Sequence, residues 1–361
     1  MANYHEQSLH NDTLKLRRLI QKLPPFTFEF FRGIEHTTSS KTRIAYAYDL
    51  NVFFTFITTQ LQEFKDISIQ SFPVKRLEDV TPDHIEYYLD YLSYYNDTSS
   101  STNDSSLPER SNKERAKLRK LASLRSFYNY YYKKQKITFN PVVLVDLPKI
   151  HEKHIIRLEA NEVADFLDIV ESGDALTKKE KQYHKKTKTR DLALITLLLG
   201  TGLRVSECVG LNIADIDFSK NGLRIIRKGG NEVIIYFGDE VADALKDYLQ
   251  ERKKIIPNSG HEDALFLSLQ DRRLSVRSVQ NLVKKYSKLV TSLKNISPHK
   301  LRSTYGTALY QETGDIYLVA DVLGHQDVNT TKKHYAAIED ERRRKAAKSV
   351  ILRREKSSDK S

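Results

Sequence analysis

The stretch of sequence that decides the fold runs from Ser297 to Tyr335 and reads SPHKLRSTYGTALYQETGDIYLVADVLGHQDVNTTKKHY. Its Ser-Pro start predicts a helix, since serine is a favoured N-cap and proline suits the first helical position. His299 and Arg302 are three residues apart and therefore share one face of that helix. His325 follows a glycine that ends a helix, which places it in a sharp turn. Two imidazoles, a guanidinium and the phenol of Tyr335 are groups that can act on a phosphodiester without a metal.

The bulk composition describes a globular protein with an excess of positive charge. The chain has 361 residues, enough for two domains, and 39% of them are hydrophobic. Its net charge of +12 suits a polyanion such as DNA, RNA or a membrane surface. No apolar run reaches the length of a membrane span, and the first residues lack an apolar signal core, so we expect a cytoplasmic protein without membrane contact. Cys208 is the single cysteine, which excludes an internal disulfide and favours a small buried side chain.

Residues 31–138 predict a small all-helical domain. Apolar residues recur every three or four positions in its first part, which indicates an amphipathic helix. Thr81 and Pro82 then mark a second helix start, and a third long helix is expected over residues 112–135. Residues 1–30 precede this domain as an N-terminal extension with one short helix.

The third of these helices is strongly basic. Residues 110–136 hold ten lysines and arginines and one glutamate. Two interpretations are open on the local sequence: the charges cover a solvated helix face, or they lie over the phosphates of a nucleic acid. A second basic segment, residues 177–190, has seven lysines and arginines and one acidic residue.

After a linker over residues 139–157, residues 158–338 predict an α+β domain. Residues 190–199 are almost wholly apolar and predict a buried helix, which a Gly-Thr-Gly sequence ends. Runs of β-branched and aromatic residues, separated by glycine-containing turns, predict a three-stranded antiparallel meander. The fold class is therefore mainly α with a small antiparallel β-sheet, followed by a basic C-terminal tail over residues 339–361. The expected strands are Asp215–Phe218, Leu223–Ile226 and Val233–Phe237, with a further short strand at Leu265–Leu267.

Two cations of this domain are candidates for binding a phosphate. Arg204 follows the glycine break at the start of a helix, where a guanidinium beside the helix N-terminus makes a seat for an anion. The alternative for Arg204 is an ion pair with Glu207, one turn further on. Lys228 lies in the Lys-Gly-Gly-Asn turn, where it is either an ordinary exposed lysine or a proton donor carried into a DNA groove.

The histidines and the tyrosine are weak signals one at a time. Most pairs spaced like His299 and Arg302 lie on solvated faces, although the first turn of a helix also favours an anion. His325 is open to interpretation as a helix-capping residue. Tyr335 is one of 20 tyrosines in the chain.

Together and in this order, these residues resemble one family. The chain is similar to the tyrosine recombinase (phage integrase) family, most of all to its Xer-type members, over roughly residues 31–345. The matching pieces are GTGLRVSE, IRKGGNE, PHKLR, VLGH and TTKKHY. One departure is Ser303, where many members have a second histidine after H-x-x-R. The six active-site positions of the family fall on Arg204, Lys228, His299, Arg302, His325 and Tyr335.

The resemblance implies strand transfer through a covalent intermediate. Tyr335 would attack the scissile phosphate and form a 3′-phosphotyrosyl bond, with His299 as the proton acceptor. Arg204 and Arg302 would clamp the non-bridging oxygens, where charge builds up in the transition state. The remaining two positions imply a general acid for the 5′ oxygen and a hydrogen-bond donor to the phosphate, at Lys228 and His325 respectively. The family's chemistry needs no cofactor, ATP or metal.

The same resemblance implies the partners. Residues 31–138 would be the core-binding domain, which holds double-stranded DNA at a specific recombination site. We also expect a homotetramer on two DNA sites, with residues 339–361 as a possible subunit-exchange helix. The candidate phosphate contacts are Arg43, Lys113, Arg115, Lys117, Lys120 and Arg125.

Three questions of function stay open on the sequence. A type IB topoisomerase shares the fold and the nucleophile, and would relax DNA without a partner site. A non-catalytic DNA-binding relative is a second alternative, against which the complete set of six residues argues. Within recombination, the biological task is chromosome dimer resolution, and thereby chromosome partition in the cell cycle, or integration and excision of a mobile element. The shortness of residues 1–30 favours a simple enzyme acting at one core site.

Overall fold

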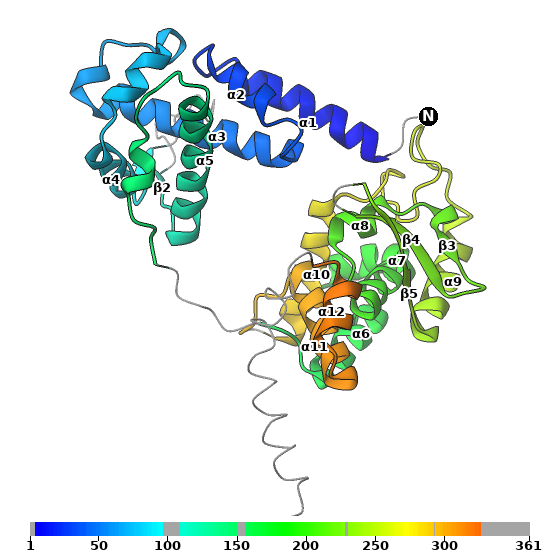
Figure 1. The fold of residues 1–361 in the computed structure, drawn as a ribbon. Coiled ribbons are helices and arrows are strands. Elements are labelled where there is room, and N and C mark those ends of the chain that lie inside the picture. Colours follow the sequence, from blue (N-terminus) through cyan, green and yellow to red (C-terminus); the bar gives the residue numbers. More distant parts are fainter. Residues whose placement is uncertain (1–3, 97–108, 150–155, 228–229, 292, 326–361) are drawn as a thin grey trace, which may run out of the picture. The chain divides into compact units, whose positions relative to one another are not determined.

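The computed structural model describes residues 4–96, 109–149, 156–227, 230–291 and 293–325. The chain divides into two compact units, Met1–Lys153 and His154–Ser361 (Figure 1). Of the predicted features, Lys228, Tyr335 and the basic tail lie outside the described residues. The finer domain boundaries given above stay predictions.

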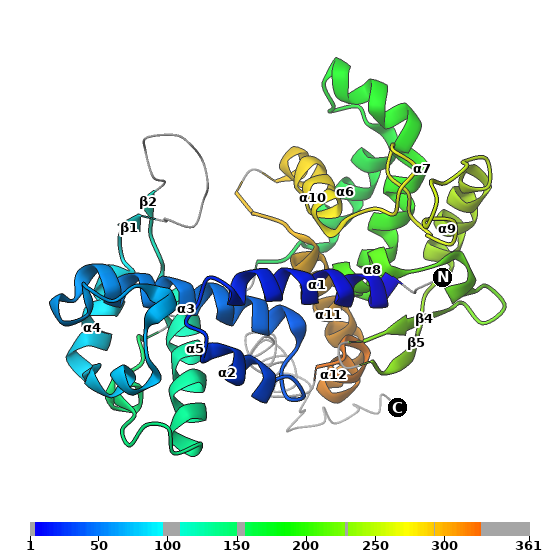
Figure 2. The same cartoon turned by 90° about the horizontal axis from the view of Figure 1, so that it is seen from above.

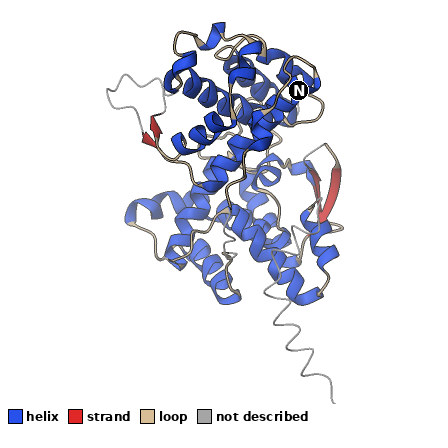
Figure 3. Ribbon diagram, turned by 60° about the vertical axis from the view of Figure 1, so that its left-hand side comes forward, coloured by secondary structure: helices blue, strands red, loops and turns tan. Residues whose placement is uncertain are grey.

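Where it is described, the first unit is helical apart from one two-stranded ladder (Figure 3). The predicted helix start at Thr81 and Pro82 is confirmed, since the Thr81 hydroxyl accepts a hydrogen bond from the backbone N–H of His84 at 3.3 Å. The elements are α1 Tyr4–Ile20, α2 Thr27–Gly33, α3 Ser40–Gln60, η1 Gln62–Phe64, η2 Ile69–Ser71, η3 Val74–Asp79, α4 Pro82–Tyr91, β1 Tyr95–Asn96, β2 Glu109–Arg110, α5 Glu114–Lys133 and η4 Pro141–Leu144.

Aromatic side chains form the core of this unit. The Phe127 ring of α5 meets Phe30 of α2 and Phe54 of α3 edge to face, with ring centroids 5.3 and 6.0 Å apart. The Tyr131 hydroxyl donates to the carbonyl of Phe26 at 2.7 Å, which satisfies its polar end. Each such ring pair contributes about 0.5–1.5 kcal/mol beyond its burial. The core therefore joins α2, α3 and α5 into one body.

Segments at both ends of the predicted helical domain pack onto this unit. Helix α1 begins at Tyr4, earlier than the short helix expected, and contacts α3. Its Asp12 accepts a hydrogen bond from the Ser40 hydroxyl at 2.8 Å. In the segment expected to be linker, Val142 and Val145 are buried, because hydrophobic side chains there find the same core.

The second unit contains a small sheet among helices, and the predicted fold class is confirmed. Helices α11 and α12, which hold most of the stretch quoted first, lie side by side in both views (Figures 1 and 2). The elements are α6 Ala160–Ser172, α7 Lys178–Thr201, α8 Val205–Gly210, η5 Ile213–Asp215, β3 Ile216–Asp217, β4 Gly222–Ile226, β5 Glu232–Tyr236, α9 Asp239–Arg252, α10 Val276–Val290, α11 Pro298–Thr313 and α12 Ile316–Leu323.

The sheet is the predicted antiparallel meander, in the order β3-β4-β5. In its register Leu223 pairs with Ile235. The prediction of a further strand at Leu265–Leu267 is wrong. Ala264 and Leu267 make only isolated bridges, to different partners, so no continuous ladder forms there.

Helix α7 unites the basic segment and the apolar segment that follows it. It ends at Gly202, whose φ of 62° is the left-handed conformation that glycine adopts readily. A Cβ at Gly202 would lie 2.5 Å from the ring of Tyr305 and 2.9 Å from the side chain of Leu323. The glycine therefore lets the end of α7 pack closely against α11 and α12. Arg204, two residues on, lies beside the end of α12, where its Nη2 donates to the carbonyl of Gly324.

Candidate active site

Arg204 lies at the N-cap of α8 and is held by a carboxylate. Its Nη1 is 2.8 Å from Oε1 of Glu207, and the backbone N–H of Arg204 donates to Oε2 of the same residue at 2.8 Å. The ion pair considered as an alternative is therefore present. The Glu207 side chain is 5% exposed, whereas that of Arg204 is 35% exposed. The buried acid thus orients a guanidinium that still reaches solvent.

Arg302 is buried in the second turn of α11 and bonds two backbone carbonyls. Its Nη1 donates to Gly202 at 2.7 Å, and its Nη2 donates to Leu323. The residue as a whole is 5% exposed. A buried charge needs such partners, because desolvation without them costs several kcal/mol. Arg302 consequently ties the end of α7 to the end of α12.

The end of α12 has the turn expected from its glycine. Gly324 has a φ of 60°, and its N–H donates to the carbonyl of Asp321 at 2.8 Å. The N–H of His325 donates to Ala320 at 2.9 Å, which completes a Schellman motif. His325 is half-buried and directly follows the helix end, to which Arg204 also bonds through the Gly324 carbonyl at 2.9 Å.

Arg227 is a residue of this site that the sequence did not indicate. It precedes Lys228 at the end of β4, and its Nη1 and Nη2 donate to the carbonyls of Asp321 and Val322 at 3.1 and 2.7 Å. Three arginines therefore occupy four consecutive carbonyls at the C-terminus of α12. A helix end carries unsatisfied carbonyls and partial negative charge, which these cations neutralise. The carbonyls and their donors are Asp321 and Val322 with Arg227, Leu323 with Arg302, and Gly324 with Arg204.

His299 lies in the first turn of α11, and its side chain is exposed. Ser297 occupies the N-cap position, but its hydroxyl makes no capping hydrogen bond. Ser303, which stands where many relatives of the resembled family have a histidine, donates to the carbonyl of His299 at 3.1 Å. The helix start and its exposed imidazole are thus formed without a side-chain cap.

Four of the six predicted site residues lie within the described part of the chain, and hydrogen bonds bring their segments together. The start of α8, the start of α11 and the end of α12 all meet at Leu323 and Gly324. Two guanidiniums beside the first turn of a helix make a strongly electropositive place, which suits a phosphate. In the whole part of the chain that the structure describes, no cluster of three or more His, Cys, Asp or Glu side chains is arranged to hold a metal ion.

Cys208 lies in α8, one turn after Arg204, and is fully buried. Burial raises the pKa of its thiol to about 12. Since the thiolate is the reactive form, we expect Cys208 to resist alkylation at neutral pH in the folded protein and to react fully in denaturant. Labelling with a maleimide, followed by mass measurement, checks this. Stoichiometric labelling of the native protein would mean that α8 opens readily.

Lys120, predicted as a phosphate contact in the first unit, needs correction. Its side chain is 6% exposed, and its Nζ lies 3.2 Å from Oδ1 of Asp49 in α3. Arg119 pairs with the other oxygen of the same carboxylate. Burial raises the pKa of Asp49, against the effect of the two cations. Lys120 therefore holds α5 against α3 and does not present its ammonium at the surface.

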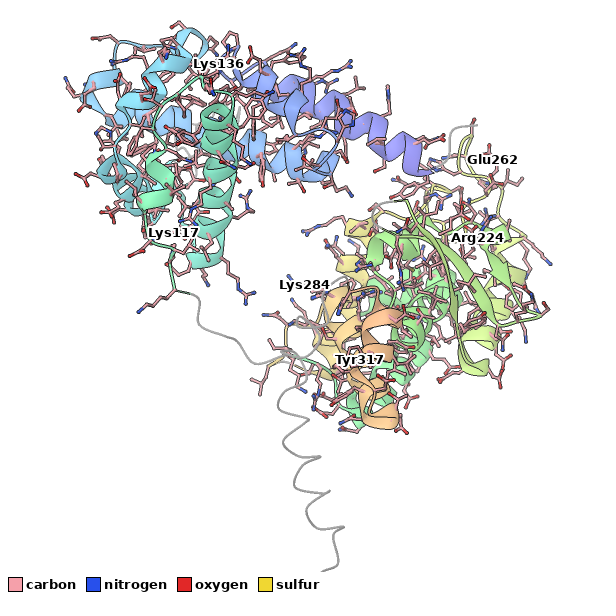
Figure 4. All side chains as sticks on the ribbon, viewed as in Figure 1. Lys117, Lys136, Arg224, Glu262, Lys284 and Tyr317 are labelled. Carbon is pink, nitrogen blue, oxygen red and sulfur yellow. The ribbon has the colours of Figure 1, made fainter. Side chains whose placement is uncertain are left out.

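The other candidates of this unit differ in exposure. Arg43 is 11% exposed along its side chain and pairs with Glu35 at 2.7 Å, and Arg125 bonds backbone carbonyls. The Nζ of Lys117, labelled on α5 in Figure 4, donates to a serine hydroxyl at 2.9 Å. Lys113 and Arg115 are exposed at the start of α5. These last two are the candidates whose side chains stand in solvent.

Comparison with known proteins identifies relatives over most of the chain. The sequence profile described as the phage integrase family matches residues 157–342. The tyrosine recombinase XerC of Caldanaerobacter subterraneus subsp. tengcongensis is 36% identical over 324 residues, which cover 86% of this chain and 82% of the relative. The tyrosine recombinase XerC of Syntrophus aciditrophicus is 29% identical over 314 residues, which cover 86% of this chain and 91% of the relative.

A solved structure shares the fold. The XerH site-specific recombinase bound to a palindromic difH substrate, in a post-cleavage complex, matches with a TM-score of 0.61 and 18% identity. The match covers 94% of this chain and 95% of that one.

In the described segments of the present chain, no helix combines the length and the apolar character needed to span a bilayer.

Proposed function

Because the chain belongs to the phage integrase family, we propose that Tyr335 is the nucleophile with which it cuts and rejoins DNA. The protein is a tyrosine recombinase, an enzyme of site-specific DNA strand breakage and rejoining. The observation that carries the assignment of its site is the convergence of Arg204 and Arg302 on the helix end that precedes His325. The start of α8, the start of α11 and the end of α12 would together form one phosphate-binding place.

The proposed first step is attack by the Tyr335 phenol on the scissile phosphate. A bond forms between the phenolic oxygen and phosphorus, and the P–O5′ bond breaks, which leaves a 3′-phosphotyrosyl link. A phenol is a weak nucleophile at neutral pH and must lose its proton during attack. We assign that proton to His299, the family's proton acceptor, whose imidazole is exposed in the first turn of α11. Lys228 gives a proton to the departing 5′ oxygen.

The two arginines stabilise charge that develops on the non-bridging oxygens. Their orientation is fixed before DNA arrives, by Glu207 for Arg204 and by two carbonyls for Arg302. Preorganised donors of this kind lower the activation free energy most effectively, because they need no rearrangement in the transition state. His325 adds a hydrogen bond to the phosphate. Reversal of the step by a 5′ hydroxyl from a second duplex joins the strands, and the phosphotyrosyl bond conserves the energy.

Double-stranded DNA with a specific site is the proposed substrate, and the first unit is proposed to hold it. Lys113 and Arg115 are the proposed phosphate contacts, because they are exposed at the start of α5. Such contacts position the protein on the duplex but carry no sequence information. Residues other than Lys113 and Arg115 must therefore recognise the bases of the site.

A joining assay with two differently labelled sites tests recombination against relaxation. The target is first recovered from host genomic DNA by capture of covalent complexes. The protein is then incubated with two duplexes that carry the same site and different labels. Hybrid duplexes with both labels support recombination. Relaxation of supercoiled plasmid without any hybrid product would instead support the activity of a type IB topoisomerase.

We further propose a homotetramer on two DNA sites, with residues 339–361 as the segment exchanged between subunits. This tail lies outside the described residues, and its Val350-Ile351-Leu352 cluster would bind a neighbouring subunit. Deletion of residues 341–361 is expected to abolish pairing of two sites while a single site is still bound. Gel mobility of the DNA complexes measures both. Unchanged pairing and recombination by the shortened protein would contradict the tetramer proposal.

For the biological task, we propose resolution of chromosome dimers, with integration and excision of a mobile element as the second candidate. The similarity to proteins named XerC favours the first task. A map of covalent adducts across the host genome distinguishes the two. A single chromosomal locus supports dimer resolution, whereas the ends of a mobile element support the second task.

A further inference from the structure

Arg227 joins two parts of the second unit that are far apart in the sequence. It stands at the end of β4, yet its Nη1 and Nη2 donate to Asp321 at 3.1 Å and Val322 at 2.7 Å, both near the end of α12. These bonds connect the β4–β5 hairpin to the end of the helix that His325 follows. Arg227 is not among the six positions assigned from the family.

The backbone of Arg227 also bonds the two described residues that follow positions 228 and 229. Its N–H donates to the carbonyl of Asn231 at 2.9 Å, and its own carbonyl accepts from the N–H of Gly230 at 3.0 Å. Lys228 is the next residue in the chain. Arg227 is therefore bonded to Gly230 and Asn231 through its backbone and to α12 through its side chain.

The half-buried guanidinium of Arg227 packs against the end of α12. A Cβ at Gly324 would lie 2.6 Å from Cζ of Arg227, so the arginine packs directly over the glycine backbone. Two hydrogen bonds and this contact restrict the side chain to one arrangement. Arg204 and Arg302 bond carbonyls of the same helix end. A shift of the hairpin would therefore displace the residues proposed to bind the phosphate.

We infer that Arg227 is a positioning residue for strand cleavage, which fixes the turn of Lys228 to the helix end of His325. The inference rests on the proposed function, in which Lys228 protonates the 5′ oxygen as the P–O5′ bond breaks. A positioned acid contributes roughly 10²–10⁴-fold to such a step, and this contribution depends on its placement. Arg227 acts through Lys228 and does not itself need to touch DNA.

A DNA substrate with sulfur in place of the scissile 5′ bridging oxygen tests this directly. Attack by Tyr335 then breaks a P–S bond and releases a thiolate. The cysteine thiol has a pKa of about 8.5, and thiols are in general far more acidic than alcohols, so a thiolate leaves at neutral pH without receiving a proton. Any variant whose defect lies in proton donation should recover on the sulfur substrate, whereas a variant with a defect in phosphate binding should not. The ratio of the two rates in one preparation is independent of the fraction of folded protein.

Three variants distinguish a loss of Lys228 positioning from a general loss of folded structure. Arg227→Met is expected to cleave ordinary DNA at least about tenfold more slowly, as part of the loss expected for Lys228→Met. Arg227→Lys keeps a donor and should lose less. Arg224→Met is the matched control, because Arg224 lies on the same strand but pairs with Asp215 at 3.0 Å and is 57% exposed. It should cleave both substrates at the rate of the unmodified protein.

On the sulfur substrate, Arg227→Met and Lys228→Met should both approach the rate of the unmodified protein. The inference is overturned if Arg227→Met cleaves ordinary DNA at full rate. It is equally overturned if Lys228→Met recovers with sulfur and Arg227→Met stays as slow as before. If Lys228→Met gains nothing from sulfur, the proton-donor role of Lys228 is wrong and the inference is lost with it, an outcome distinct from the first two.

Discussion

Tyr335→Phe is expected to abolish the covalent complex with DNA completely. The change removes one oxygen atom, which is the atom proposed to bond to phosphorus, and phenylalanine offers no other nucleophile. DNA affinity should be unchanged, because binding depends on the cations and not on this hydroxyl. Denaturing gel electrophoresis of protein trapped on a nicked substrate measures the adduct, and a filter-binding titration measures the affinity.

Tyr317→Phe is the matched control for this substitution. Tyr317 lies in the same stretch of sequence, on α12, and is 71% exposed (Figure 4). Removal of its hydroxyl should leave adduct formation intact. A covalent adduct with Tyr335→Phe, or its loss with Tyr317→Phe, would mean that the nucleophile has been wrongly assigned.

Arg302→Met is expected to have the second largest effect, on both rate and stability. The lost clamp on the phosphate should slow cleavage at least about 10²-fold. The carbonyls of Gly202 and Leu323 would also lose their donor, and each unsatisfied buried group costs about 1–3 kcal/mol. Single-turnover cleavage measures the first effect, and urea denaturation measures the free energy of unfolding.

Arg252→Met separates the two effects. Arg252 is 4% exposed in α9 and also bonds two carbonyls, those of Ala264 at 3.1 Å and Glu262 at 2.8 Å. Its loss should lower the free energy of unfolding by a similar amount and leave the cleavage rate of the folded protein unchanged. Equal loss of cleavage in both variants would show that Arg302 acts only by holding the fold.

Local sequence signals predicted several elements of both units. Thr81 with Pro82 marked the start of α4, the Gly-Thr-Gly sequence at 200–202 marked the end of α7, and turn residues divided the meander. These signals work because capping, left-handed backbone and hairpin turns depend on a few neighbouring residues. The order of the motifs then identified the family, which the comparisons confirm.

Contacts between distant segments could not be predicted in this way. Nothing near Arg227 in the sequence indicates that its side chain bonds a helix more than ninety residues later. The face of α5 was misjudged for the same reason. Lys120 is one cation in a basic segment. Only the packing of α3 against α5 shows that the buried carboxylate of Asp49 pairs with it. A charge run predicts a basic helix but not which of its side chains is turned inward.

Sequencing of the peptide that is covalently attached to DNA tests the central claim most directly. The unmodified protein is trapped on a duplex containing its site, with a nick that releases the 5′-hydroxyl fragment and prevents rejoining. After proteolysis, mass spectrometry locates the modified residue, and nuclease digestion identifies the linked end. We expect one adduct, between Tyr335 and a 3′ phosphate. A linkage to another residue, or to a 5′ phosphate, would contradict it.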